Sequence, residues 1–145
     1  MELDELYQQV ILDHAKRPRN RRELPECTAM AMGENPSCGD EVTVFVKLSP
    51  DGKIAETTFM GNGCAISQAA ASILTTQLAG KTRDEAAQLI HTYHASLGSD
   101  GESYAEDESL GNLAALGGVR KFPQRVKCAT LASHALEDAL AEKSV

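Results

Sequence analysis

Four cysteines offer the most distinctive chemistry in this chain: Cys27, Cys38, Cys64 and Cys128. Cys38 follows a run of turn-forming residues and precedes a predicted strand, Cys64 lies between a predicted strand and a predicted helix, and Cys128 lies near the start of the last predicted helix. Such positions at the ends of elements are where a scaffold usually carries its functional groups. Cys27 falls outside them, and we interpret it as a bystander thiol in or near a strand.

Three of the cysteines and one carboxylate have the residue types of a tetrahedral zinc site with three sulfur ligands and one oxygen ligand. Asp40 follows Cys38 closely, so one loop offers two of the four ligands. The cysteines are far apart, however, and no pair has the Cys-x-x-Cys spacing that is typical of many zinc sites. From spacing alone, a shared metal site and three unrelated buried thiols both remain open.

Helix ends and nearby cations favour the thiolate form of these cysteines. A thiol at a helix N-terminus meets the positive end of the helix dipole, and we expect this at Cys64 and at Cys128. Arg125 and Lys127 act on Cys128 in the same direction.

Length and composition predict one domain, residues 1–145, with its own core. Apolar residues make up 42% of the 145 residues, enough for a core that needs no disulfides. The net charge of −7 argues against general binding to nucleic acid or to an anionic membrane. No apolar run approaches the roughly 20 residues that span a bilayer. The start of the chain has no signal-peptide core, so we expect a cytoplasmic protein with reduced cysteines.

The hydrophobic pattern predicts an α+β fold, with a small antiparallel sheet of about three strands packed against several helices. Val42, Val44 and Val46 recur at every second position, and a turn signal at 50–52 precedes a second strand that ends near Met60. A further strand near Met30 is weakly marked. The predicted helices are 3–16, 66–78, 82–94, 110–116 and 126–141. An acidic excursion begins the stretch 99–118, which contains neither Lys nor Arg.

Three blocks of the chain resemble the signature motifs of the IscU/NifU-type iron–sulfur cluster assembly proteins. They are Asn35-Pro36-Ser37-Cys38-Gly39-Asp40, Gly61-Asn62-Gly63-Cys64-Ala65-Ile66-Ser67 and Lys127-Cys128-Ala129-Thr130-Leu131. The first predicted helix, with Ile11-Leu12-Asp13-His14, and the turn Pro18-Arg19-Asn20 are similar to the N-terminus of the same family. The resemblance runs from about residue 3 to about residue 140 and implies a SufE/NifU (IscU)-like fold.

Two features point to the SufU branch of that family. The scaffold type has a His directly before its third motif cysteine, where this chain has Lys127. The acidic stretch at about 99–118 also looks like the insertion that is characteristic of SufU proteins. By this resemblance, Cys38, Asp40, Cys64 and Cys128 are expected to be zinc ligands, and Cys38 is expected to accept sulfur.

The resemblance therefore implies a zinc-dependent sulfurtransferase. It would accept persulfide sulfur from a SufS-type cysteine desulfurase and pass it to a downstream iron–sulfur scaffold or another sulfur acceptor. The alternative is an assembly scaffold on which a labile [2Fe–2S] cluster forms on the same ligands; Lys127 favours the sulfurtransferase. A third hypothesis is a non-catalytic, zinc-stabilised binding domain that unfolds when zinc is lost. The choice of Cys38 over Cys64 or Cys128 as acceptor rests on the resemblance.

Other polar residues have simpler interpretations. Arg125 is a candidate for steadying the thiolates and a transient persulfide, and an ion pair with an acid is the alternative. His91 and His94 have a metal-compatible spacing at the end of a predicted helix, where we prefer a solvent-facing helix end. His14 is expected to have a structural or partner-contact role, and His134 has no motif around it. The arginine-rich turn after the first helix is either a solvated turn or a docking surface for an acidic partner.

Overall fold

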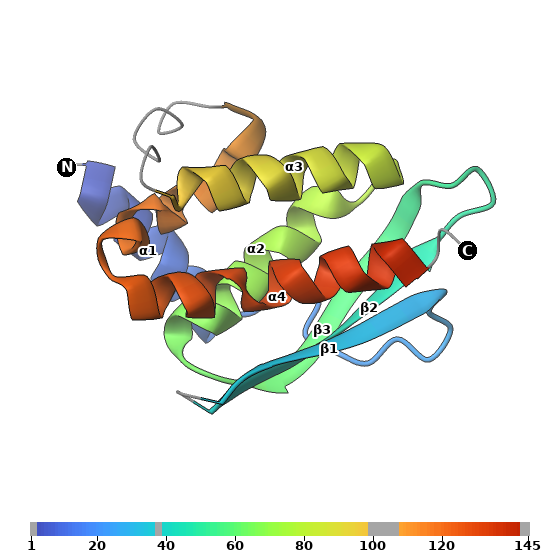
Figure 1. Ribbon diagram of the computed structural model, residues 1–145, viewed down its shortest axis with the longest axis horizontal. Coiled ribbons are helices and arrows are strands. Elements are labelled where there is room, and N and C mark those ends of the chain that lie inside the picture. The colour runs from blue at the N-terminus through green and yellow to red at the C-terminus, as the bar shows by residue number, and fades with distance from the viewer. Residues whose placement is uncertain (1–2, 37–38, 99–107, 143–145) are drawn as a thin grey trace.

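A three-stranded antiparallel sheet in the order β1-β2-β3 is the platform of the fold (Figure 1). The computed structural model describes residues 3–36, 39–98 and 108–142. The strands are β1 (Ala29–Asn35), β2 (Asp40–Leu48) and β3 (Ile54–Asn62). The predicted hairpin is therefore confirmed, and the weakly marked segment near Met30 is a full strand.

The central strand is held by its alternating valines. Val42, Val44 and Val46 are all buried on the face of β2 that meets the helices, and β-branched side chains suit such a pleated surface. Val44 pairs with Phe59 of β3 on one side and with Ala31 of β1 on the other. This register fixes where β2 begins and therefore where Asp40 lies.

The described part of the chain forms four α-helices and one 3-10 segment besides the sheet. They are α1 (Leu3–Lys16), α2 (Ala65–Leu78), α3 (Arg83–Ser96), η2 (Glu108–Lys121) and α4 (Pro123–Glu142). α4 packs on β1 and β2, and α2 packs on β3, so these two helices cover one face of the sheet (Figure 1). α3 packs against η2 and α4, whereas α1 packs against α2 and η2.

Local sequence signals predict the helix ends to within a few residues at most positions, and two of the starts are informative. Thr82 and Glu85 form the predicted capping box at the start of α3, each side chain bonding the other residue's backbone. The last helix begins at Pro123, three residues earlier than the predicted Val126. Proline is well suited to the first turn of a helix, because its fixed backbone angle matches and its missing N–H is not needed there.

The stretch 99–118 contributes to the core as well as to the surface. Residues 99–107 of this acidic excursion lie outside the described part of the chain. The short helix predicted at 110–116 is part of η2, whose Leu110, Leu113 and Leu116 are buried. The segment is irregular at Gly111, where φ is +53°, a backbone conformation that favours glycine.

Two buried polar contacts fasten α1 and α3 to their neighbours. His14 of α1 shares a 2.7 Å hydrogen bond with Ser72 of α2, and burial lowers the pKa of this histidine. Tyr93 of α3 donates from its hydroxyl to the Ala129 carbonyl of α4 at 2.6 Å, and burial raises the pKa of the phenol. His14 therefore has a structural contact within the chain.

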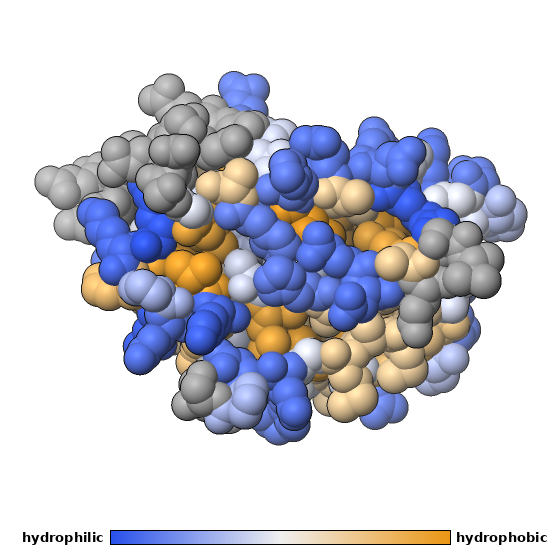
Figure 2. Space-filling view, in the orientation of Figure 1, coloured by the Kyte–Doolittle hydropathy of each residue, from blue (hydrophilic) through white to orange (hydrophobic). Residues whose placement is uncertain are grey.

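The surface in Figure 2 is mostly hydrophilic along the outer sides of α3 and α4, and apolar surface shows between the elements. None of the helices in the described part of the chain has the length and apolar character needed to cross a membrane.

Candidate metal centre

Three of the four predicted ligands lie together in the structure. Asp40, Cys64 and Cys128 each offer one ligand atom, and these atoms lie within 4.8 Å of one another. They come from the start of β2, the residue before α2 and the second turn of α4. Cys38, the fourth predicted ligand and predicted sulfur acceptor, lies outside the described residues.

Asp40, at the start of β2, is held in place by Cys64, which follows the end of β3. Its side chain is buried, at 4% exposure, and its Oδ1 accepts a 3.0 Å hydrogen bond from the backbone N–H of Cys64. Its Oδ2 lies 3.6 Å from Cys64 Sγ. A buried carboxylate needs hydrogen bonds or a cation to offset the loss of water. The contact with Cys64 supplies one such bond, and its position beside two thiols suits a cation.

Glycine at position 63 makes this close approach possible. A Cβ on Gly63 would lie 2.3 Å from Ser67 Oγ and 2.9 Å from Asp40 Oδ1, closer than side chains approach one another. Ser67 itself is buried; its hydroxyl donates to the Cys64 carbonyl at 3.0 Å and lies 3.9 Å from Cys64 Sγ. Sequence reasoning assigned no role to Gly63 or Ser67, although both lie in the motif block around Cys64.

The donor set and its size fit a zinc ion. Zinc–sulfur bonds of about 2.3 Å and zinc–oxygen bonds of about 2.0–2.2 Å in a tetrahedron separate the ligand atoms by about 3.5–3.8 Å. The group found here spans up to 4.8 Å, so small side-chain movements would close it around an ion. Two sulfurs and one carboxylate are ligands that Zn²⁺ commonly takes.

Gly63→Ala is expected to weaken Zn²⁺ binding by about 10- to 100-fold, the usual effect of disturbing the residues that orient metal ligands. The added Cβ must push away either Ser67 or the Asp40 carboxylate. Competition with a chromophoric chelator measures the affinity. Gly118→Ala is the control, because a Cβ there meets nothing within 4 Å, and its zinc affinity should not change. Unchanged affinity in Gly63→Ala would contradict this account of the site.

The two thiols differ in their relation to the helix ends. Cys64 directly precedes α2 and is its N-cap residue, as expected. Cys128 lies in the second turn of α4, because that helix begins at Pro123. The helix dipole acts mainly within the first turn. The expectation that Cys128 lies at a helix terminus is therefore wrong, and the earlier start of α4 is the reason.

The cations near Cys128 face outward. Lys127 and Arg125 are exposed on α4. Arg125 lines a hollow of about 610 Å³, together with Phe122 of the preceding turn and with Ala65 and Ile66 at the start of α2. Arg125 is thus beside the helix that Cys64 caps, and its role toward the thiolates stays a prediction.

The arginine-rich turn is bonded to the rest of the chain. Arg19 pairs with Asp13 at 2.6 Å, and Arg22 pairs with Glu56 of β3. Arg21 donates to the Gly61 carbonyl at 2.7 Å and so holds the end of β3 just before Cys64. These contacts within the chain favour a structural role over a purely solvated turn.

The remaining sequence candidates lie away from the three grouped ligands. Cys27 is a partly buried free thiol before β1, outside the Asp40, Cys64 and Cys128 group. The solvent-facing interpretation of His94 is wrong, because its ring is partly buried and bonds Ser133 of α4 at 2.7 Å. Burial lowers the pKa of His94.

Comparison with known proteins finds relatives of the NifU, IscU and SufU types. The family model described as NifU-like N terminal domain matches residues 6–141. The chain is 42% identical over 142 residues to the zinc-dependent sulfurtransferase SufU of Bacillus subtilis (strain 168), covering 97% of this chain and 93% of that protein. It is 40% identical over 138 residues to the iron–sulfur cluster assembly scaffold protein IscU of Streptococcus pyogenes serotype M1, covering 95% and 84% respectively. The crystal structure of FiSufU, described as an iron–sulfur cluster assembly scaffold protein for the SUF system of Fervidobacterium islandicum AW-1, aligns with a TM-score of 0.82 at 32% identity. The match covers 96% of this chain and 99% of that one.

Proposed function

Because the chain belongs to the family of NifU-like N-terminal domains, we propose that it acts in iron–sulfur cluster biogenesis as a zinc-dependent sulfurtransferase. Its partner would be a SufS-type cysteine desulfurase, from which it accepts persulfide sulfur for a downstream scaffold or another acceptor. The zinc ligands would be Cys38, Asp40, Cys64 and Cys128.

The grouping of Asp40, Cys64 and Cys128 supports this proposal most strongly. Asp40 and Cys64 are 24 residues apart in the chain but are joined by a hydrogen bond. Cys128, from the last helix, lies beside them. Cys38 is close to Asp40 in the chain and completes the sulfur-rich donor set. Lys127, in place of the His of scaffold-type proteins, favours the sulfurtransferase over a cluster scaffold.

Each residue has a defined part in the proposed transfer. Bound zinc would keep the thiols deprotonated and protect them from oxidation. The thiolate of Cys38 attacks the outer sulfur of the partner's persulfide, the sulfur–sulfur bond of that persulfide breaks, and the partner's thiolate leaves. The transferred sulfur stays on Cys38 as a persulfide. Asp40 and Cys64 hold their places through the hydrogen bond between them.

Cysteine turnover by a purified SufS-type desulfurase tests the proposal. We expect the zinc-loaded protein to stimulate turnover and Cys38→Ala to abolish that stimulation. Cys27→Ser is the matched control, because Cys27 lies outside the grouped ligands and the variant should stimulate normally. The proposal fails if the zinc-loaded protein gives no stimulation, or if Cys38→Ala becomes persulfidated at the full rate.

The cluster-scaffold alternative uses the same residues, and the relative from Streptococcus pyogenes named as a scaffold is nearly as similar. Anaerobic reconstitution with iron and sulfide separates the two functions. A stable chromophore at stoichiometric iron would favour the scaffold, whereas loss of colour on desalting, with zinc retained, would favour the sulfurtransferase.

A further inference from the structure

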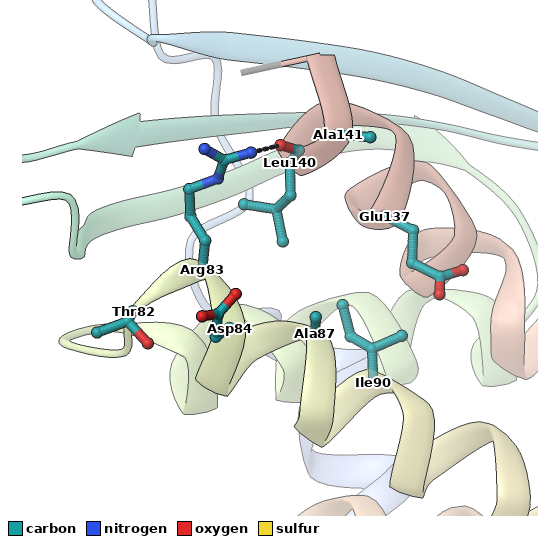
Figure 3. A pocket seen from close by; sticks show the side chains of 8 residues that line it. All are labelled: Thr82, Arg83, Asp84, Ala87, Ile90, Glu137, Leu140 and Ala141. Carbon is teal, nitrogen blue, oxygen red and sulfur yellow. Dashed lines mark hydrogen bonds between the residues drawn. The ribbon is translucent and has the colours of Figure 1, made fainter. Parts of the chain in front are cut away.

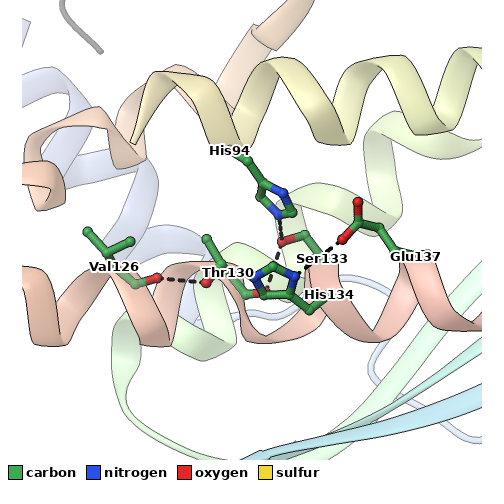
Figure 4. A network of polar contacts seen from close by, with 6 residues as sticks. All are labelled: His94, Val126, Thr130, Ser133, His134 and Glu137. Atoms are coloured by element: carbon green, nitrogen blue, oxygen red, sulfur yellow. Dashed lines mark hydrogen bonds and ion pairs between the residues drawn. The ribbon is translucent and has the colours of Figure 1, made fainter. Parts of the chain in front are cut away.

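A second group of metal-ligating side chains lies where α3 meets α4 (Figure 4). His94 comes from α3, and His134 and Glu137 come from α4. One ligand atom from each lies within 4.8 Å of the others, as in the group of Asp40, Cys64 and Cys128, which we call the thiol site. The two imidazole rings are 4.6 Å apart between centroids and tilted by 36°.

The Ser133 hydroxyl lies within hydrogen-bond distance of both His94 and the Thr130 carbonyl. The Ser133 hydroxyl has a single hydrogen and donates it to the Thr130 carbonyl at 2.9 Å. With its hydrogen on Thr130, the Ser133 hydroxyl accepts the 2.7 Å hydrogen bond from His94 Nε2, and in this arrangement Nε2 carries the ring proton. In this tautomer Nδ1 carries the lone pair and would be the ring nitrogen that binds a metal ion. Metal-binding histidines commonly donate their other ring N–H to a fixed acceptor in this way.

His134 and Glu137 are arranged as a pair on one face of α4. They are three residues apart, and Glu137 Oε1 lies 3.2 Å from His134 Nδ1 (Figure 4). Both side chains are exposed, so water and ions reach them freely.

The space beside Glu137 is open. Glu137 also lines a hollow of about 670 Å³ between the start of α3 and the end of α4 (Figure 3). The other lining residues include Asp84 and Ile90 of α3, and Arg83 closes one side by donating to the Leu140 carbonyl at 2.5 Å. Because the side chains of His134 and Glu137 are exposed, an ion bound between them would keep at least one position for water.

We propose that His94, His134 and Glu137 form a second site, open to solvent, for a divalent first-row metal ion such as Zn²⁺. Two imidazoles and one carboxylate with an open position are a common donor set for zinc and for neighbouring first-row ions. The site is separate from the thiol site, because His134 lies six residues beyond Cys128, about 9 Å along α4. An ion there would join α3 to the helix that carries Cys128.

Imidazole NMR signals of the ¹⁵N-labelled protein test this site directly. One equivalent of Zn²⁺ is added first, and then an excess of Zn²⁺. We expect the ring signals of His94 and His134 to shift together in the excess while those of His14 and His91 stay in place. Before zinc is added, the spectrum should show the proton of His94 on Nε2. This readout does not depend on persulfide transfer.

Matched variants decide whether the response comes from the three residues. His134→Ala and Glu137→Gln should each require at least about tenfold more Zn²⁺ to shift His94. His91→Ala, which changes an exposed histidine on the same helix, should leave the response unchanged. The proposal is overturned if His94 and His134 do not respond to excess zinc, if all four histidines respond alike, or if His134→Ala leaves the His94 response intact.

Discussion

Cys64→Ser is expected to lower the affinity for Zn²⁺ about a hundredfold or more. Structural zinc sites with four ligands have apparent binding free energies of about 10–16 kcal/mol, or about 3 kcal/mol for each ligand. Serine preserves the size of the side chain, but its hydroxyl is a poor replacement for a thiolate. Cys64 Sγ lies 3.6 Å from Asp40 Oδ2, so its loss also removes the neighbour against which the carboxylate packs. Anaerobic competition with a chromophoric chelator measures the affinity.

Cys27→Ser is the matched control for this variant. It makes the same chemical change at a partly buried free thiol that lies outside the Asp40, Cys64 and Cys128 group. We expect its zinc affinity to equal that of the unmodified protein. Equal losses in both variants would show that the effect comes from general loss of structure, and equal retention would exclude Cys64 as a ligand.

Gly61→Ala is expected to lower the free energy of unfolding by about 3 kcal/mol or more. The backbone of Gly61 has φ +145°, a conformation that residues with a side chain rarely adopt. An added Cβ would lie 2.3 Å from the Glu41 carbonyl oxygen. Gly61 pairs with Val42 between β2 and β3, so neither strand can move without breaking the register. Urea unfolding at a fixed zinc concentration measures the loss.

Gly118→Ala provides the comparison for stability. A Cβ at Gly118 meets nothing within 4 Å, and we expect a change of less than about 1 kcal/mol. If Gly61→Ala is as stable as Gly118→Ala, then β2 and β3 leave room for a side chain at position 61, and the account of this contact is wrong. A large loss at Gly61 alone would show that the β2–β3 register depends on this glycine.

The two glycines that flank Asn62 have different expected effects. Gly61 governs the strand register, whereas Gly63 lies against the Asp40 carboxylate. A variant at Gly61 should act first on folding, and a variant at Gly63 should act first on zinc affinity. The sequence motif presents both as a single glycine-rich block, and only their surroundings in the fold separate their roles.

Local patterns along the chain are enough to predict most of the elements and the class of fold. Alternating valines at 42, 44 and 46 predict β2, and Thr82 with Glu85 predicts the start of α3. These signals are local: a strand period and a helix cap depend on residues within a few positions of one another. The motif blocks also identified Asp40, Cys64 and Cys128 as candidates, through resemblance to a family. Cys38 stays a prediction as ligand and as acceptor.

Which of the candidate residues come into contact depends on packing across the whole fold. Asp40 and Cys64 are 24 residues apart, and His94 and Ser133 are 39 residues apart. The pairing of β2 with β3 brings the first two together, and the packing of α3 on α4 brings the second two together. A local pattern predicts which face of a helix is apolar. It does not predict which turn of another helix that face will contact. That choice depends on how the whole core packs, and so the His94 and His134 group had no signal in the sequence.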